Sequence, residues 1–74
     1  MDDDLRILIG YRIKERRCSL GLTREGLASM TKPPMSSKYL WELETGRKKI
    51  SGDILRRLAI TLEVTADWLL CLPV

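Results

Sequence analysis

The sequence Ser36-Ser-Lys-Tyr-Leu-Trp-Glu-Leu-Glu-Thr-Gly46 carries signals for both ends of a single helix. The Ser36 hydroxyl can accept from the free N–H groups of a first helical turn, and Gly46 can adopt the left-handed conformation in which helices commonly end. At about 100° per residue, Leu40 and Leu43 share one side of this helix, with Tyr39 at its edge. The opposite side holds Ser37, Lys38, Trp41 and Glu42. The pattern predicts a helix over about residues 37–45 whose polar outward face, with a tryptophan in it, is not needed for folding.

A first helix is predicted upstream, over about residues 5–20. Its apolar stripe recurs at helical spacing and consists of Leu5, Ile9, Ile13 and Leu20. The acidic residues 2–4 suit the positive end of the helix dipole, and Gly21 is placed to end the helix. Arg17 falls on the apolar stripe. Because a charge facing a core needs a partner, we expect a buried or half-buried acid beside Arg17.

A second helix, over about residues 24–31, is predicted between these two. Thr23 can cap it, and its inward residues are expected to be Leu27, Ala28 and Met30. Pro33-Pro34 must then break the helix, because proline disfavours helix both at its own position and at the residue before it. We therefore expect a stiff turn several residues long before Ser36.

Two further helices are predicted after Gly46. Ser51 can cap one over about residues 52–62, in which the inward positions are Ile54, Leu55, Leu58, Ala59 and Leu62. Thr65 can cap a short last helix over about 66–71, which Pro73 would close. No segment alternates with the period of a strand. The sequence therefore predicts an all-α fold of five helices.

Length and charge limit the kind of protein this can be. A chain of 74 residues has the size of one small domain, which buries only about 60% of its unfolded-chain surface, so most apolar side chains must serve the core. We expect one domain over residues 1–74, without a deep pocket. The net charge is +3, and setting aside the acidic residues 2–4 leaves a more basic body. This balance favours a polyanionic partner.

The composition argues against several kinds of chemistry. The chain contains no histidine, and Cys18 and Cys71 are its two cysteines. We therefore expect no zinc site, no cofactor, no small-molecule substrate and no enzymatic activity. Two cysteines so far apart, with no secretory signal, indicate reduced thiols that pack as small hydrophobic residues in a cytoplasmic protein. The apolar runs are too short to span a bilayer, so no membrane partner is expected.

Four motifs follow one another along the chain. They are Arg12-Ile-Lys-Glu-Arg-Arg17, Leu20-Gly-Leu-Thr-Arg-Glu-Gly-Leu-Ala28, Leu43-Glu-Thr-Gly-Arg47 and Leu58-Ala-Ile-Thr-Leu-Glu-Val-Thr-Ala-Asp-Trp-Leu-Leu70. In this order the chain resembles the helix-turn-helix domains of lambda-type phage repressors and Cro proteins and of their bacterial Xre relatives. The resemblance runs from Ile9 to Leu70. It implies transcriptional control by operator binding, usually as a dimer on a palindrome with the third helix in the major groove.

Carried over by position, the resemblance also implies roles for individual residues. The residues that contact base edges would be Ser37, Lys38 and Glu42, and Trp41 lies on the same exposed face. Phosphate contacts would come from Arg24, Ser36, Tyr39, Arg47, Lys48 and Lys49. Glu44 matches a glutamate that pairs with an arginine of the first helix, here Arg17. This agrees with the acid that the apolar stripe required independently.

Three features depart from the family pattern. Pro33-Pro34 lengthens a turn that typically contains glycine, which can tilt the third helix or shorten the second. Glu42 is acidic on a face meant for DNA, although a carboxylate can accept from cytosine N4. Trp41 is larger than the usual occupant of its position. It has three interpretations: packing on a thymine methyl or a sugar, packing back over Ser37 or Pro34, or contact with another protein. For residues 47–49 the plain alternative is a solvated turn.

The end of the chain is a candidate for self-association. Leu69, Leu70 and Leu72, with Val74, supply apolar surface for a weak homodimer that forms mainly on DNA, whereas Trp68 is expected in the core, with a dimer contact as the alternative. The leading functional hypothesis is a repressor that binds double-stranded DNA in the cytoplasm, in association with the nucleoid. The alternative is a protein-interaction module on the same fold, which the salt dependence of DNA affinity would distinguish.

Overall fold

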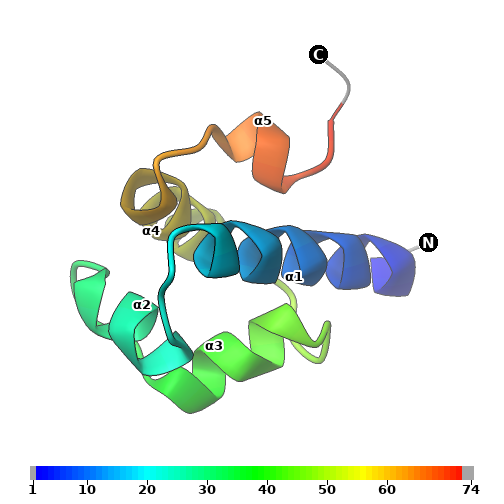
Figure 1. Cartoon of the computed structure of the whole chain (residues 1–74). Helices are drawn as coiled ribbons and strands as arrows, with labels where there is room; N and C mark the ends of the chain where they lie inside the picture. The colour runs from blue at the N-terminus through cyan, green and yellow to red at the C-terminus, as the bar shows by residue number, and fades with distance from the viewer. Residues whose placement is uncertain (1, 73–74) are drawn as a thin grey trace.

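The computed structural model describes residues 2–72 of the chain. Within that range it contains five helices and no strand: α1 (Asp2–Ser19), α2 (Arg24–Met30), α3 (Ser37–Glu44), α4 (Gly52–Leu62) and α5 (Ala66–Leu69). α1 crosses the middle of the molecule, with α2 and α3 packed together on one side of it and α4 and α5 packed together on another (Figure 1). The all-α, five-helix fold predicted from the sequence is confirmed.

Four helices begin at the hydroxyl residues that the sequence indicated. The side-chain oxygens of Thr23, Ser36, Ser51 and Thr65 each accept from the backbone N–H three residues further on, at 2.9–3.2 Å. Each cap pairs one of the N–H groups that a first helical turn leaves without an internal partner. The starts of α2, α3, α4 and α5 are therefore set by local chemistry.

Two helices end at the glycines expected to end them. Gly21 after α1 has φ 72° and Gly46 after α3 has φ 76°, both in the left-handed region. At the end of α3 the N–H of Arg47 donates to the Glu42 carbonyl at 2.9 Å, which is the long hydrogen bond of a Schellman motif. This bond turns the chain back along the helix it has just left.

The last two helices end in the same conformation without glycine. Glu63 has φ 58° and Cys71 has φ 61°. The predicted end of α5 near residue 71 was therefore wrong: the helix stops at Leu69, because the left-handed Cys71 already turns the chain. Pro73, expected to close this helix, lies outside the described residues.

The core draws on all five helices. Its buried apolar side chains are Ile9, Ile13, Leu27, Ala28, Leu40, Leu43, Leu58, Ala59, Leu62 and Leu69. Three residues predicted to face inward are instead substantially exposed: Leu5 (42%), Leu20 (38%) and Met30 (48%). All three lie at the ends of helices, where the neighbouring helices no longer cover the apolar stripe. Cys18 is also exposed, so its packing as a buried hydrophobe was wrongly predicted.

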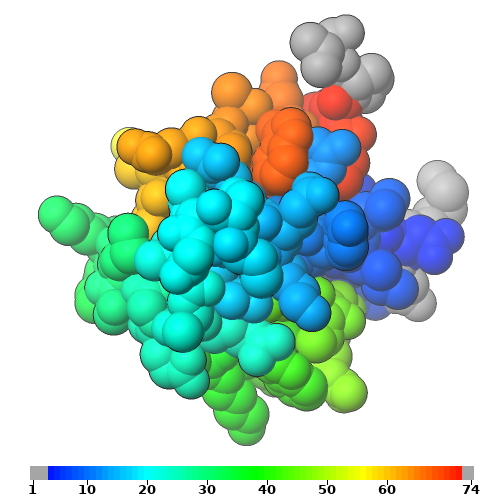
Figure 2. Space-filling model, in the orientation of Figure 1, coloured from blue at the N-terminus to red at the C-terminus, as the bar shows by residue number. Residues whose placement is uncertain are grey.

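The connection between α2 and α3 is held from inside by Thr31, which is 0% exposed. Its hydroxyl lies 2.9 Å from the Ala28 carbonyl oxygen and 3.1 Å from that of Pro33. The N–H of Met35 donates to the same Ala28 carbonyl at 3.1 Å. The Lys32–Pro33 peptide bond is cis. This connection projects at the left edge of the space-filling view (Figure 2).

Gly10 marks the closest approach between α1 and α3. A Cβ atom at this position would lie 2.5 Å from the Leu43 carbonyl oxygen and closer still to that of Glu44. Real side chains do not approach backbone oxygens so closely, so α1 can rest against the end of α3 only because residue 10 has no side chain. The close approach at Gly10 was not predicted, although a glycine inside a helical pattern is a signal of close packing.

Replacing Gly10 by alanine should lower the free energy of unfolding by about 2 kcal/mol, because the added methyl group pushes two backbones apart and outweighs the gain in helix propensity. Urea denaturation followed by circular dichroism measures the change. Gly52→Ala is the matched control, since its added Cβ would have no atom within 4 Å apart from its chain neighbours and the backbone of its own helix. The control should be neutral or slightly stabilising. Equal stability of the Gly10→Ala variant and the parent would contradict the close approach.

Candidate nucleic-acid interface

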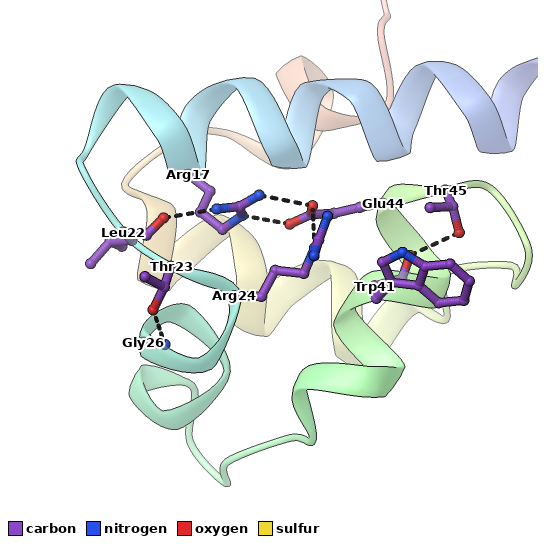
Figure 3. A network of polar contacts seen from close by, with 8 residues as sticks. All are labelled: Arg17, Leu22, Thr23, Arg24, Gly26, Trp41, Glu44 and Thr45. Carbon is purple, nitrogen blue, oxygen red and sulfur yellow. Dashed lines mark hydrogen bonds and ion pairs between the residues drawn. The ribbon is translucent and has the colours of Figure 1, made fainter.

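The carboxylate of Glu44 joins the first three helices (Figure 3). Its Oε2 accepts from Nε of Arg17 at 2.7 Å, and its Oε1 accepts from Nη2 of Arg17 and from Nε of Arg24, each at 3.1 Å. Arg17 is near the end of α1, Arg24 is the first residue of α2 and Glu44 is the last residue of α3. A single side chain therefore fixes α2 and α3 relative to each other and to α1.

This network is poorly hydrated. The Glu44 side chain is 1% exposed, that of Arg17 9% and that of Arg24 35%. The hydrogen bond with Glu44 raises the pKa of Arg17 above its usual value, although burial alone would lower it. Nη1 of Arg17 also donates to the Leu22 carbonyl at 2.8 Å, which ties down the connection between α1 and α2. The pairing of Arg17 with Glu44 was predicted from the sequence, and the structure contains it.

Arg24 has a partner that the sequence did not reveal. It was expected to meet a phosphate, and in the structure its Nε is bonded to Glu44. Its guanidinium is still partly exposed and lies at the first turn of α2. Arg24 is thus anchored at one nitrogen and open to solvent elsewhere, an arrangement that orients the side chain without burying it.

The outward face of α3 carries the residues that the periodicity placed there. Lys38 is exposed, while Ser37, Trp41 and Glu42 are half-buried. At the N-terminal end of this helix, Ser36 is exposed and its oxygen accepts from the Tyr39 N–H at 3.0 Å. The indole ring of Trp41 extends from α3 away from the network around Glu44 (Figure 3).

The loop after α3 folds back over this face. The N–H groups of Arg47 and Lys48 both donate to the Glu42 carbonyl, at 2.9 and 3.3 Å. The Arg47 guanidinium carbon lies 4.8 Å from the centroid of the Trp41 ring. Nζ of Lys48 lies 3.6 Å from Oε1 of Glu42 and 5.6 Å from the centroid of the Tyr39 ring. Residues expected in two separate groups, one on the helix and one in the loop, therefore form a single surface.

Sequence reasoning missed these contacts, but a signal for them exists. In a Schellman motif the residue after the left-handed glycine returns to the level of the last helical turn. With Gly46 recognised as that glycine, Arg47 and Lys48 fall beside Trp41 and Glu42. Lys49 follows them and is exposed, with no ion pair to any residue in the 2–72 range.

Residues 13–69 match the Helix-turn-helix family, and this match shows which family the chain belongs to. The chain is a helix-turn-helix protein of the lambda and Xre type. In such proteins the pair corresponding to α2 and α3 is the helix-turn-helix, and the second helix of the pair is the recognition helix. Membership of this family supports a function as a DNA-binding transcription regulator.

Solved structures of two regulators resemble this helix-turn-helix protein. The clp gene regulator ClgR from Corynebacterium glutamicum is 31% identical, with a TM-score of 0.80 over 90% of this chain and 84% of its own. A second ClgR structure gives a TM-score of 0.81 at the same identity, over 90% of this chain and 69% of its own. The restriction-modification controller protein C.AhdI from Aeromonas hydrophila is 26% identical, with a TM-score of 0.80 over 86% of this chain and 94% of its own. No curated protein sequence matches significantly.

Among the apolar residues at the end of this helix-turn-helix chain, Leu69 differs from its predicted role. Leu69 was expected in a dimer contact, but it is 0% exposed because it fills the core beneath α5. Leu70 is half-buried and Leu72 is 51% exposed, so these two remain on the surface, whereas Val74 lies outside the described residues. Trp68 is half-buried against Arg12 of α1. None of the helices between residues 2 and 72 has the length and hydropathy of a membrane span.

Replacing Glu44 by alanine should lower the free energy of unfolding by about 3 kcal/mol, because it leaves the buried Arg17 charge without a partner. Arg24→Ala is the matched control. It should cost less than about 1 kcal/mol, because its side chain is 35% exposed and water can replace it at the edge of the network. Urea denaturation of both variants measures the difference.

The combined variant Arg17→Met and Glu44→Leu should recover much of that loss, since it removes both buried charges together. A Glu44→Ala variant as stable as the parent, or a double variant that loses the sum of both single changes, would contradict a coupled buried ion pair.

Proposed function

We propose that this helix-turn-helix protein is a transcription repressor that binds a specific double-stranded DNA sequence in the cytoplasmic nucleoid. α3 would enter the major groove, as in other members of the family. The observation that supports this most is the continuous surface of polar α3 side chains and loop cations, neither of which the core requires. An arrangement of this kind can contact the floor and the phosphate edge of a groove together.

Two sets of side chains would make different contacts with DNA, one with bases and the other with phosphates. Ser37, Lys38 and Glu42 would face base edges, which differ between sequences, and Trp41 lies among them with one ring face covered by Arg47. Phosphates, which are the same on every sequence, would be met by Arg24, Ser36, Tyr39, Arg47, Lys48 and Lys49.

Glu42 would make binding selective by exchanging its partner. In the free protein its carboxylate is paired with Lys48 at 3.6 Å. When Lys48 moves to a phosphate, Glu42 is left near DNA unpaired unless a cytosine amino group donates to it. Sites lacking that cytosine would therefore be penalised, and the ion pair would keep the carboxylate compensated while the protein is free.

A protein-interaction module on the same fold is the alternative. It is favoured by the contacts of Trp41 with Arg47 and of Glu42 with Lys48, which already engage part of the α3 face within the chain. The two functions differ in salt dependence, because only phosphate binding releases counterions from DNA.

Affinities for a preferred duplex, selected from a random pool, and for random duplexes should distinguish residues that read bases from residues that contact phosphates. Lys38→Ala should weaken that duplex by about 1–3 kcal/mol and random duplexes less, because a lysine donating to guanine contributes only where that guanine stands. Arg47→Ala should weaken both duplexes by similar factors and reduce the slope of log affinity against log salt by about one. Fluorescence anisotropy with labelled duplexes measures both. The DNA-reading proposal fails if no duplex is enriched, or if Lys38→Ala binds every duplex as the parent does.

The protein is further proposed to form a weak homodimer through Leu70 and Leu72, strengthened when two copies bind adjacent half-sites of a palindrome. Sedimentation should give a monomer alone and two copies on a two-half-site duplex. Leu72→Ser should reduce the cooperativity of binding, because it removes exposed apolar surface from the contact. Leu20→Ser, a change of another exposed leucine at a distant helix end, is the control. One copy per two-half-site duplex at saturation would contradict the dimer.

A further inference from the structure

The structure contains two arginine–tryptophan pairs of nearly the same geometry. The Arg12 guanidinium carbon lies 4.7 Å from the centroid of the Trp68 ring, and that of Arg47 lies 4.8 Å from the centroid of the Trp41 ring. At these distances the negative face of the indole attracts the cation. The two pairs differ in what the guanidinium does with its N–H groups.

The first pair is part of the folded framework. Arg12 is half-buried, and its Nη1 donates to the backbone carbonyl of Trp68 at 2.8 Å. It thereby joins α1 to α5. The hydrogen bond and the stacking act between the same two residues, so this arginine is already committed to holding the fold together.

In the second pair the arginine side chain is held in place, but its N–H groups remain available as hydrogen-bond donors. Arg47 is exposed, and its guanidinium donates no hydrogen bond to any residue in the part of the chain that the structure describes. Its backbone N–H is fixed on the Glu42 carbonyl at 2.9 Å, so the base of the side chain is held as well as its end.

A stacked guanidinium keeps its donors available. The N–H bonds of a guanidinium lie in its plane and point away from its central carbon, so contact between that carbon and a ring face does not use them up. It can therefore donate two parallel hydrogen bonds to a phosphate without leaving the tryptophan. A flexible arginine would have to be ordered at the moment of binding, whereas this one is ordered beforehand.

We propose that Trp41 is a positioning residue, which holds the Arg47 guanidinium ready for a DNA phosphate and does not read a base. The inference rests on the proposed DNA-binding function. It replaces a base-edge contact for this tryptophan with an indirect contribution that is the same on every DNA sequence. The anomalous tryptophan on the polar face of α3 then has a role that needs neither a thymine nor a partner protein.

The test compares Trp41→Leu, which keeps apolar volume without a ring face, with Trp41→Phe, which keeps a ring face. Trp41→Leu should weaken the preferred and the random duplex by the same factor, about twofold to fivefold, corresponding to the usual strength of an exposed cation–π contact. Trp41→Phe should retain most of the parent affinity. The salt slope should stay at the parent value in both variants, because Arg47 still meets the phosphate. In an Arg47→Ala background, Trp41→Leu should have no further effect.

Arg12→Ala is the matched control, since it breaks the other pair. It should lower the midpoint of thermal unfolding and leave the duplex affinity of the folded protein unchanged. The inference is overturned if Trp41→Leu weakens the preferred duplex alone, which would indicate base reading. It is also overturned if Trp41→Leu weakens the Arg47→Ala variant as strongly as the parent.

Two further outcomes are decisive. A parent that binds no duplex overturns the proposed function and the positioning role with it, whereas the results above overturn the positioning role alone. If Trp41→Leu does not fold, the cycle of Trp41→Gln with Arg47→Ala measures the same coupling, because glutamine also lacks a ring face. Additive effects in that cycle overturn the inference.

Discussion

The fold depends on one carboxylate that has no access to water. With a side chain 1% exposed, Glu44 is compensated only where Arg17 and Arg24 converge on it, and the three residues belong to three different helices. Few arrangements of these helices bring the charges together, so the network selects one packing even though burying charges adds little net stability. Gly10 acts in the same place, because it lets α1 rest directly on the backbone at the end of α3. Together they hold α3 at a defined angle to α1.

Much of this architecture could be predicted from the sequence, because its signals are local. Hydroxyl caps and left-handed glycines specify where α2, α3 and α4 begin and where α1 and α3 end, whatever surrounds them. The Arg17–Glu44 pair was predictable for a different reason: a charge on an apolar stripe demands a counter-charge, and the family resemblance indicated Glu44 as the residue that supplies it. The end of α5 was missed because Cys71 adopts a left-handed conformation that its residue type does not signal. The burial of Leu69 beside the half-buried Leu70 depends on how α5 lies on α1 and α4, which no local pattern encodes.

The candidate site could also be predicted only in part, because some of its features are local and others depend on packing. Periodicity was sufficient to place Lys38, Trp41 and Glu42 on one face of α3, and composition was sufficient to mark the cations after Gly46. Their mutual contacts could not be predicted by treating helix and loop as separate, since these contacts follow from the direction in which the chain leaves the helix. Arg24 illustrates a second limit. A residue type suited to phosphate was also suited to a buried acid, and only the packing of α2 against α3 decides that it meets Glu44.

The absence of a side chain at residue 10 has a consequence for how DNA would be accommodated. Two helices whose backbones touch cannot slide or roll past each other without disturbing the close packing at the point where they touch. If α3 is the helix that enters the groove, as proposed, this contact would oppose a change of its angle to suit an imperfect site. The double helix would then have to change its bending or groove width to fit the protein, and how easily it does so varies with base sequence. Base pairs that α3 never touches would in this way influence which sites are occupied, through the stiffness of the duplex.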